Sequence, residues 1–185
     1  MAKNPRVLFV CLGNICRSPM AEAVFRHLVN EAGLSGQIDV ESAGTGSWHA
    51  GERPHPGTLA ILKQHQVEVG GKRARQLTRS DLREFDYVIA MDEENVADIQ
   101  ALYGRRVPRL LEYARQDGTL DVPDPYDSGN FAIVYDLVLA GSKGLLEHIR
   151  QQEIIAFVNT VTQLGKVIAR IAIDALAPKA AAWVD

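Results

Sequence analysis

Two cysteines and an arginine stand close together near the start of the chain, in the stretch Cys11-Leu12-Gly13-Asn14-Ile15-Cys16-Arg17-Ser18. An apolar run precedes the stretch and a helical pattern follows it, so we predict a loop between a strand and a helix. Backbone N–H groups gather at such a loop, and the positive end of the helix dipole favours an anion there. We expect Cys11 to ionise readily in that field and to act as a nucleophile. The planar guanidinium of Arg17 suits two oxygens of a phosphate.

The predicted phosphate-binding residues form one consecutive set: Leu12, Gly13, Asn14, Ile15, Cys16, Arg17 and Ser18. A Cys-x5-Arg spacing alone also fits a buried thiol beside a surface charge. The preceding strand, the Gly and Asn inside the loop and the Ser-Pro helix start after it favour the phosphate site. We expect Ser18 to cap the helix and Pro19 to occupy its first position. A Walker phosphate loop is excluded because its Gly-Lys-Ser/Thr ending is absent.

The composition limits the class of protein. With 185 residues, 46% of them hydrophobic and 23% charged, the chain suits one globular domain with a small appendage. A net charge of −3 argues against a nucleic-acid-binding protein. No cleavage site follows the first apolar run, so we expect a cytoplasmic protein. In a reducing cytosol two cysteines indicate reactive or buried thiols, and they are too few for a zinc site, so we expect no metal or cofactor.

The alternation of β-branched runs with helical patterns predicts an α/β fold, a four-stranded parallel sheet with helices on both faces. The phosphate-binding loop would join its first strand to its first helix. Strands are predicted over 6–11, 38–44 and 85–91, with a short fourth within 106–113, and helices over 18–33, 57–66, 92–103 and 131–150. Gly141 and Gly144 lower the helix propensity of the last of these.

The segment 151–185 has a different pattern from the domain predicted over 1–150. Its apolar residues recur at three- and four-residue steps, as expected for one amphipathic helix: Ile154, Phe157, Val158, Val161, Leu164, Ile168, Ile171 and Ala175. Lys166, Arg170 and Asp174 make a membrane span unlikely on this pattern. Such a stripe must be covered, so we expect either packing on the core or self-association into a homo-oligomer. A fused or engineered segment would show the same pattern.

Several motifs together resemble one known family. "VCLGNICRSPMAEAVF" resembles the signature of the low-molecular-weight protein tyrosine phosphatases, and the similarity continues through "ESAGTGSWHAGERPHP", "RARQLT", "YVIAMDEEN" and "VPDPYDSGN". It covers about residues 5–150 with the motifs in the family's order. The resemblance implies hydrolysis of phosphotyrosine in proteins without a cofactor.

The resemblance also assigns roles at the reacting centre. Cys11 matches the nucleophile that forms a cysteinyl-phosphate, and Arg17 would hold the phosphate oxygens together with the loop N–H groups. Asp124 matches the general acid, which then acts as a base on water. An aspartate before Pro125 is also an ordinary turn residue. Asp121 is a nearby competitor, but only Asp124 is followed by Pro-Tyr.

Four further residues match supporting positions of the family. Ser18 would donate a hydrogen bond to the thiolate, and Asn14 and Ser42 would hold the loop in its left-handed bends. Asp92 matches an acidic position near the site, although capping of the helix over 92–103 explains it nearly as well. Each of these residues also has an ordinary structural interpretation outside the motif.

The entrance and the second thiol complete the implied site. Trp48 and Tyr126 match the aromatic walls of the entrance, and His49 would help select the peptides that dock. Such a deep aromatic slot suits phosphotyrosine better than phosphoserine. Cys16 matches a position that forms a reversible disulfide with the nucleophile under peroxide, although a buried loop thiol is the simpler interpretation.

Some features depart from the family pattern and leave other functions open. His65-Gln66 lacks the usual glycine after a helix, and Lys72 stands where some members carry a histidine. An arsenate reductase on the same fold is one alternative, but no cysteine follows Cys16 to relay a disulfide. A silent phosphopeptide-binding module is another, which the joint presence of a thiol, an arginine and an acid disfavours. The resemblance allows a bacterial tyrosine kinase as the protein partner.

Overall fold

A computed structural model describes residues 4–114 and 118–180, without the side chains of 155–160, 165 and 168–180. The chain divides into two compact units, Met1–Leu146 and Glu147–Asp185. The first unit contains the whole sheet and every residue predicted for the site. The fold and the site are therefore described within this unit.

The first unit is built on a parallel sheet with strand order β2-β1-β3. Its strands are β1 (Arg6–Cys11), β2 (Asp39–Gly44) and β3 (Tyr87–Ala90). The helices are α1 (Arg17–Glu31), α2 (Pro56–Gln64), α3 (Asp81–Glu84), α4 (Glu93–Tyr103), the 3-10 helix η1 (Leu110–Tyr113), α5 (Pro125–Ser128) and α6 (Phe131–Ala180). The predicted α/β class with a parallel sheet is confirmed, and so is the loop between the first strand and the first helix.

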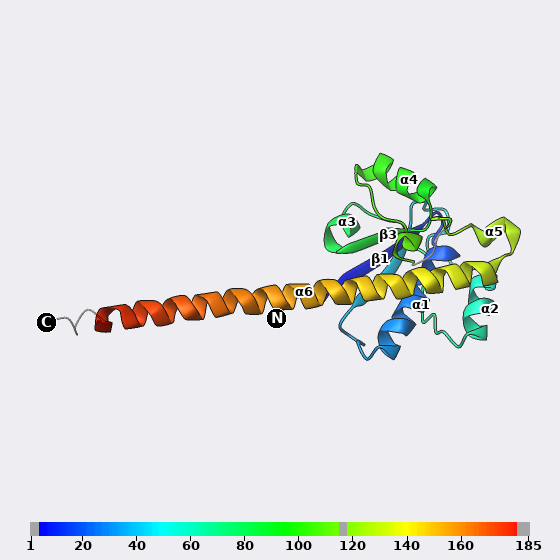
Figure 1. The fold of residues 1–185 in the computed structure, drawn as a ribbon. Coiled ribbons are helices and arrows are strands. Elements are labelled where there is room, and N and C mark those ends of the chain that lie inside the picture. Colours follow the sequence, from blue (N-terminus) through cyan, green and yellow to red (C-terminus); the bar gives the residue numbers. More distant parts are fainter. Residues whose placement is uncertain (1–3, 115–117, 181–185) are drawn as a thin grey trace. The chain divides into compact units, whose positions relative to one another are not determined.

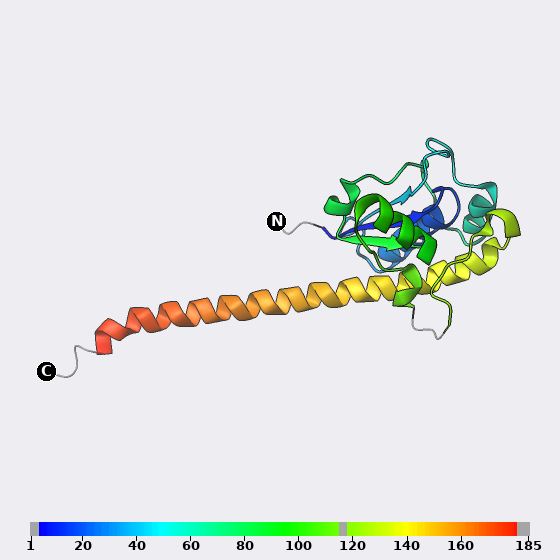
Figure 2. The same ribbon diagram turned by 90° about the horizontal axis from the view of Figure 1, so that it is seen from above.

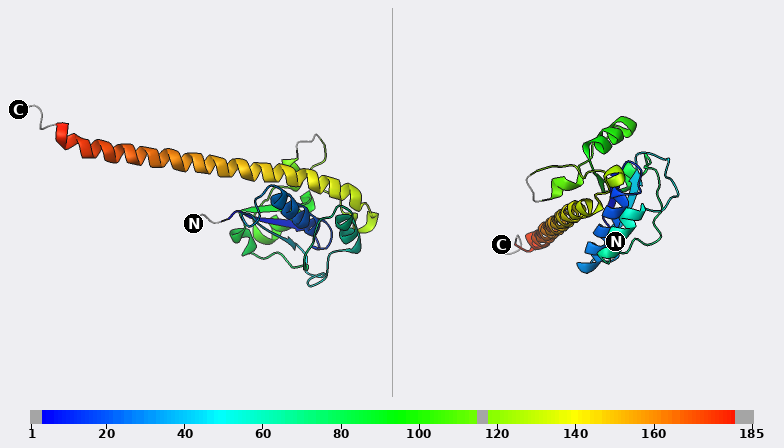
Figure 3. Two further views of the ribbon diagram at one scale, coloured as in Figure 1. Left: turned by 90° about the horizontal axis from the view of Figure 1, so that it is seen from below. Right: turned by 90° about the vertical axis from the view of Figure 1, so that its right-hand side faces the viewer.

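Helices cover both faces of this sheet. Helix α1 lies on one face, and α3 and α4 lie on the other, as the views in Figures 1, 2 and 3 agree. The central strand β1 is apolar along its whole middle, and its residues 7–10 are fully buried. Such a continuous apolar run is typical of a parallel strand covered on both faces. All three strands run in the same direction, so the carboxyl end of β1 and the loop that follows it lie at one edge of the sheet.

The predicted fourth strand is not formed in the described part of the chain. Arg109 makes one isolated bridge to Ala90, and Ala90 N–H donates to the Pro108 carbonyl oxygen at 2.9 Å. Proline has no backbone N–H, so Pro108 cannot donate a further hydrogen bond to β3 and the strand pairing does not extend. The chain then turns into η1, which buries Leu110 and Leu111. Among the described residues the sheet is therefore three-stranded, with two isolated bridges, Ala90–Arg109 and Gly44–Gln76.

Helix α1 begins two residues earlier than the sequence predicts, at Arg17 and not at Pro19. Cys16, not Ser18, occupies the N-cap position, and it makes no side-chain capping bond. Ser18 lies inside the first turn because its hydroxyl is committed to Cys11 and Asn14. The helix ends at Glu31, and Gly33 follows with a positive φ of 71°. The helix thus ends just before the predicted glycine, whereas the predicted N-cap at Ser18 is wrong.

Gly141 and Gly144 lie inside α6 because η1 approaches the helix closely. A Cβ atom on Gly141 would lie 2.6 Å from Leu110 Cγ, and one on Gly144 would overlap the Tyr113 carbonyl. The cost in helix propensity is therefore offset by close packing in the first unit. The glycines mark a contact between helices and not an end of α6.

Of the segment after residue 150, the described residues 151–180 lie in α6, which continues to Ala180. Of its predicted apolar stripe, Ile154, Val161 and Leu164 are exposed. The other stripe residues, Phe157, Val158, Ile168, Ile171 and Ala175, lie outside the described side chains. None of the helices, where described, has the length and apolar character needed to span a bilayer.

Candidate active site

Cys11 is the last residue of β1, and the backbone around it is held from outside the loop. The carbonyl oxygens of Cys11 and Leu12 accept hydrogen bonds from the N–H groups of Thr45 and Gly46, each at 2.9 Å. A Cβ atom on Gly44 would lie 2.7 Å from the Leu12 carbonyl oxygen, so only glycine allows this approach. The thiol of Cys11 is buried, and its Sγ lies 3.1 Å from Ser18 Oγ. The expected Cys11–Ser18 contact is therefore present.

Asn14 holds the turn in the middle of the loop. It is buried with a φ of 56°, the left-handed region that asparagine tolerates better than most residues. Its Nδ2 donates to Ser18 Oγ at 2.8 Å and to Ser42 Oγ at 2.9 Å, while its Oδ1 accepts from the Arg75 N–H at 2.9 Å. The structure thus brings together Asn14, Ser18 and Ser42, as the sequence predicted.

The Arg17 side chain makes polar contacts with three other residues of the site. Its NH1 donates to Asp92 and to the Val122 carbonyl oxygen, and its NH2 lies 2.6 Å from Asp124 Oδ2. Its Nε is buried without a hydrogen-bond partner. Burial disfavours the guanidinium charge, but Cys11, Asp92 and Asp124 together outweigh it and raise the pKa of Arg17. A permanent cation with one unused donor is therefore held beside the thiol.

Both predicted aspartates cap helices and face Arg17. Asp92 Oδ1 accepts from the Asn95 N–H at 2.7 Å at the start of α4, as the sequence predicted. Asp124 Oδ1 accepts from the Tyr126 N–H at 3.1 Å at the start of α5. In each residue the second carboxylate oxygen is left for the guanidinium. The capping role and the site role, which the sequence set against each other, coexist in both.

Cys11, Arg17 and Asp124 line one cavity of about 450 Å³, whereas Asn14, Ser18, Ser42 and Asp92 do not. Its wall includes Leu12, Gly13, Ile15 and Cys16 from the loop, Trp48 and His49 from the segment after β2, and Asp124, Tyr126 and Asp127 from α5. Trp48 and Tyr126 are 62% and 54% exposed, so they stand at the rim. The His49 ring lies between them, with centroids 6.3 Å from each. The predicted entrance residues therefore share one opening above Cys11.

Cys16 is a residue of the same loop, and its thiol, like that of Cys11, is buried and free. Its carbonyl oxygen accepts from Thr58 Oγ1 at 3.2 Å, which joins the loop to α2. Burial, assisted by the nearby Cys11 and Asp124, raises the pKa of Cys16 to about 12. The two thiols are thus placed in different surroundings within one loop.

Sequence reasoning missed several residues that contact the site. The Val122 carbonyl binds Arg17, and a backbone oxygen leaves no signal in residue types. Asp127 lines the cavity next to Tyr126, and its place within the predicted loop could have suggested it. Glu22 and Lys72 form a buried ion pair behind Ser42, at a distance of 3.1 Å. In the residues that the structure describes, no three His, Cys, Asp or Glu side chains cluster as metal ligands.

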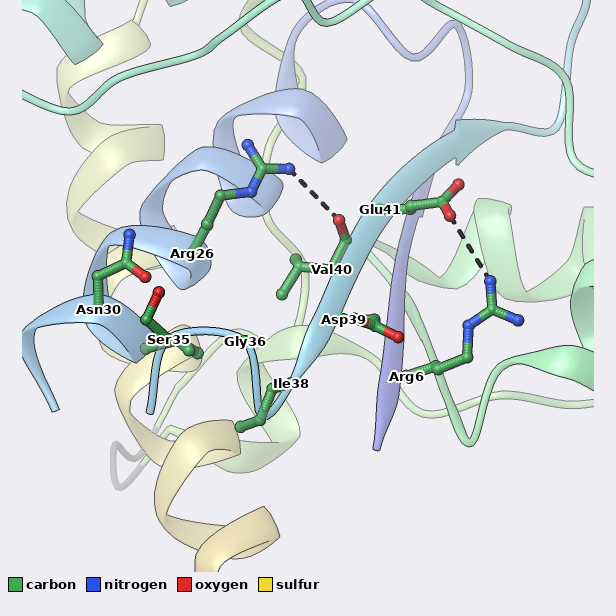
Figure 4. Close-up of a pocket in the computed structure, with 10 residues that line it drawn as sticks. Arg6, Arg26, Asn30, Ser35, Gly36, Ile38, Asp39, Val40 and Glu41 are labelled. Atoms are coloured by element: carbon green, nitrogen blue, oxygen red, sulfur yellow. Dashed lines mark hydrogen bonds and ion pairs between the residues drawn. The ribbon is translucent and has the colours of Figure 1, made fainter. Parts of the chain in front are cut away.

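A second cavity of about 460 Å³ lies at the opposite edge of the sheet, where β1 and β2 begin. Figure 4 shows Arg26 reaching the Val40 carbonyl and Arg6 facing Glu41. Asn30, Ser35 and Asp39 add further polar groups to its wall. This cavity contains cations but no thiol.

A thiol at the end of a parallel strand, an arginine six residues later at the start of a helix and an acid on a separate loop define a cysteine-dependent phosphatase type of site. A sequence profile described as "Low molecular weight phosphotyrosine protein phosphatase" matches residues 6–154. The chain belongs to this family. The residues after 154 lie outside the match.

Individual relatives agree with this membership. The low molecular weight protein-tyrosine-phosphatase YfkJ of Bacillus subtilis is 48% identical over 151 residues, which cover 80% of this chain and 97% of YfkJ. A phosphatase of the same description from Schizosaccharomyces pombe is 49% identical over 135 residues, covering 70% of this chain and 86% of that protein. The crystal structure of YfkJ has a TM-score of 0.79 at 46% identity, covering 82% of this chain and 98% of YfkJ.

One solved structure with a similar fold carries a different description. The Drosophila arginine phosphatase DARP has a TM-score of 0.71 at 33% identity, covering 77% of this chain and 96% of that one. The fold therefore hosts more than one phosphorylated side chain, and the residues of the pocket must decide the substrate of this chain.

Proposed function

We propose that this protein hydrolyses phosphotyrosine in proteins, and aryl phosphates, through a cysteinyl-phosphate intermediate. The observation that carries the proposal is the buried Arg17 Nε without a partner, on a guanidinium whose charge acts on Cys11. An unused buried donor costs about 1–3 kcal/mol unless a ligand satisfies it. A phosphate oxygen is the acceptor that fits a guanidinium beside a thiolate.

In the first step, the phosphate sits among the N–H groups of residues 12–18 and the fork of Arg17. The Cys11 thiolate attacks phosphorus, the S–P bond forms and the bond to the phenolic oxygen breaks. The conjugate acid of that oxygen has a pKa near 10, so a proton donor lowers the barrier. Asp124 gives this proton. Since Asp124 Oδ2 lies 2.6 Å from Arg17, binding of the dianion draws the guanidinium away from the acid.

In the second step, water replaces the departed phenol. Asp124, now ionised, takes a proton from the water as its oxygen attacks phosphorus and the S–P bond breaks. The thiolate leaves with its electron pair, stabilised by a hydrogen bond from Ser18 Oγ. Inorganic phosphate departs, and the enzyme returns to its starting protonation state.

The shape of the entrance favours an aromatic substrate. Leu12 and Ile15 give the cavity an apolar wall, and Trp48 and Tyr126 stand at its rim. A phenyl ring between such walls is buried and makes ring contacts. The shorter side chain of phosphoserine has no ring to make these contacts.

The test compares turnover on matched peptides that carry phosphotyrosine, phosphoserine or phosphoarginine, with p-nitrophenyl phosphate as a general substrate. We expect the phosphotyrosine peptide to have the highest kcat/KM, and Cys11→Ser to abolish its turnover. Arsenate reduction coupled to thioredoxin is assayed in parallel. A wild-type enzyme without phosphatase turnover would overturn the proposal, and faster turnover of phosphoarginine or arsenate would replace it.

We further propose that Cys16 protects the nucleophile by forming a disulfide with Cys11 under peroxide, which releases water as the thiols are oxidised. Treatment with peroxide and then dithiothreitol should restore activity in the wild type. In Cys16→Ser, activity should not return, since Cys11 oxidises further. Equal recovery in both would exclude the guard role.

The two parts of the chain, on either side of residue 150, have separate proposed partners. We propose that residues 1–150 form the phosphatase domain, acting in the cytoplasm on a bacterial tyrosine kinase, and that the helical extension 151–185 mediates self-association. Failure to dephosphorylate such a kinase, or cell fractionation that finds the protein elsewhere, would refute the first part. An unchanged monomeric mass by light scattering after deletion of 151–185 would refute the second.

A further inference from the structure

A series of hydrogen bonds connects Cys11 to a buried carboxylate on α1. Ser18 Oγ, 3.1 Å from Cys11 Sγ, accepts from Asn14 Nδ2, which also donates to Ser42 Oγ. Ser42 Oγ in turn lies 2.6 Å from Glu22 Oε2. Glu22 is thus linked to the nucleophile through Ser18, Asn14 and Ser42, although it does not line the cavity.

The charge of Glu22 fixes the direction of the first bond in this series. An ionised carboxylate can only accept, so Ser42 must donate its single hydroxyl hydrogen to Glu22. The Ser42 oxygen is then left to accept from Asn14 Nδ2. The amide of Asn14 is held in this orientation at its other end too, because its Oδ1 accepts from the Arg75 N–H at 2.9 Å.

The direction continues to the thiol. Ser18 Oγ receives a hydrogen from Asn14, so its own hydrogen is available to Cys11 Sγ or to the Ala43 carbonyl oxygen at 3.3 Å. A thiolate is the stronger acceptor of the two because it carries a charge. A hydrogen bond donated to the thiolate favours the ionised form of Cys11.

Two cations pair with the Glu22 carboxylate away from water. Glu22 and Lys72 side chains are only 8% and 9% exposed, and Lys72 Nζ lies 3.1 Å from Glu22 Oε2 while Arg26 pairs with Oε1. Lys72 Nζ also donates to the Ser42 carbonyl oxygen at 2.7 Å. Burial lowers the pKa of Lys72, and the attraction of Glu22 opposes this. Arg75 and Glu41 are the other charged groups that act on Lys72.

We propose that Glu22 and Lys72 are positioning residues, which keep Ser42 as an acceptor for the Asn14 amide and so hold Ser18 in place to maintain Cys11 as a thiolate. A neutral side chain at position 22 would let Ser42 donate elsewhere and Asn14 lose its acceptor. The loss of Lys72 would leave the buried Glu22 carboxylate with one cation fewer and would remove the hydrogen bond to the Ser42 carbonyl oxygen. The inference rests on the proposed function only in taking Cys11 as the nucleophile.

The experiment measures ionisation of Cys11 directly, by the ultraviolet absorbance of the thiolate against pH. The titration of Cys11→Ser is subtracted to remove the contribution of Cys16. In Glu22→Gln and in Lys72→Met we expect the midpoint to move to higher pH by about one unit, which is about tenfold less thiolate on the acidic side. The acidic limb of kcat/KM for p-nitrophenyl phosphate should move in the same direction, with kcat at higher pH changing much less.

Two controls separate positioning from general loss of stability. Lys72→Arg keeps the charge and should keep the wild-type midpoint. Ile99→Ala removes a fully buried side chain on α4, which has no part in the series, and should lower the melting temperature without moving the midpoint. An equal shift in Ile99→Ala would overturn the proposal.

An unchanged midpoint in folded Glu22→Gln and Lys72→Met would also overturn it. If circular dichroism shows that these variants do not fold, Ser42→Ala decides, since it interrupts the same series and keeps the ion pair. It should show the shift, and an unshifted titration counts against the proposal. Because the titration needs no turnover, a wild-type enzyme without phosphatase activity would refute the proposed function and leave this test intact.

Discussion

Cavities of nearly equal volume, about 450 and 460 Å³, lie at the two ends of the same parallel sheet, and both contain arginine. At the carboxyl ends of the strands, Arg17 is buried beside a thiol, with its Nε unpartnered. At the other end, Arg6 pairs with Glu41 and Arg26 with the Val40 carbonyl, as Figure 4 shows. Arg6 also pairs with Glu84, and Arg26 with Glu22. Both arginines of the second cavity are therefore already paired within the protein.

The difference shows that neither volume nor arginine defines an anion site. Among the described buried side chains, the polar atoms without a partner are Arg17 Nε, Asn95 Oδ1 and Ser142 Oγ, and none of these residues lines the second cavity. The first cavity also lies where parallel strands end and helix α1 begins, so its field favours an anion. If this contrast decides the function, substitutions at the first cavity should change turnover far more than matched substitutions elsewhere.

The largest effect is expected from exchanging arginine for lysine at each end. Arg17→Lys keeps the charge but loses the planar fork, so we expect kcat for p-nitrophenyl phosphate to fall by about 10³-fold or more. Arg6→Lys, the matched change at the other cavity, should stay within about twofold, since exposed ion pairs contribute little. Comparable losses in both variants would break the contrast.

The two thiols of the loop should differ almost as much in their rates of alkylation. With its pKa raised from 9.0 to about 12, Cys16 holds about 10³-fold less thiolate near neutral pH than an ordinary cysteine, and this fraction rises only as the pH approaches 12. Iodoacetamide at about pH 7 should therefore modify Cys11 alone. Mass spectrometry checks this, with Cys11→Ser as the control that stays unmodified. Alkylation of Cys16 at a similar rate would contradict the assigned burial.

Replacing the acid should have a smaller effect that depends on the substrate. Asp124→Asn keeps the cap on α5 but removes the proton, so turnover of phenyl phosphate should fall by about 10²-fold. For p-nitrophenyl phosphate, whose leaving oxygen needs little protonation, the loss should be below about tenfold. The ratio of the two losses, measured by steady-state kinetics at one pH, is the readout. Equal losses would mean that Asp124 only positions Arg17.

Much of this contrast was predictable from the sequence, for local reasons. The strand 6–11 was predicted with its observed ends, because a continuous apolar run stops at a polar loop. The cap at Asp92 was predicted because the residue and its partner Asn95 are three residues apart. The loop was predicted from its own residues, whereas the proposed acid and entrance residues came from the resemblance to the family. Patterns of this kind depend only on neighbours in the chain.

The errors arose where distant segments decide the outcome. The fourth strand was expected from β-branched and apolar residues around 106–113, but Pro108 has no N–H to extend the pairing. Ser18 was expected as a cap because no local signal shows that its hydroxyl is needed by Cys11 and Asn14. Lys72 gave no sign of its partner, since Glu22 lies 50 residues earlier in the sequence and the two meet only in the fold.

The smallest effect is expected at Gln66, which has a φ of 58° and is, with Asn14 at 56°, one of two non-glycine residues with positive φ in the described part of the chain. Gln66 follows the end of α2, where glycine usually takes this conformation, and strain there is relieved without loss of a contact to the site. Gln66→Gly should raise the free energy of unfolding by about 0.5–1 kcal/mol, with turnover unchanged. Asn14→Gly relieves the same backbone strain but removes hydrogen bonds to Ser18 and Ser42, so it should lose both stability and activity. Urea unfolding with parallel kinetics distinguishes them: if both glycines stabilise the protein and both variants stay active, the Asn14 side chain is not what holds the loop.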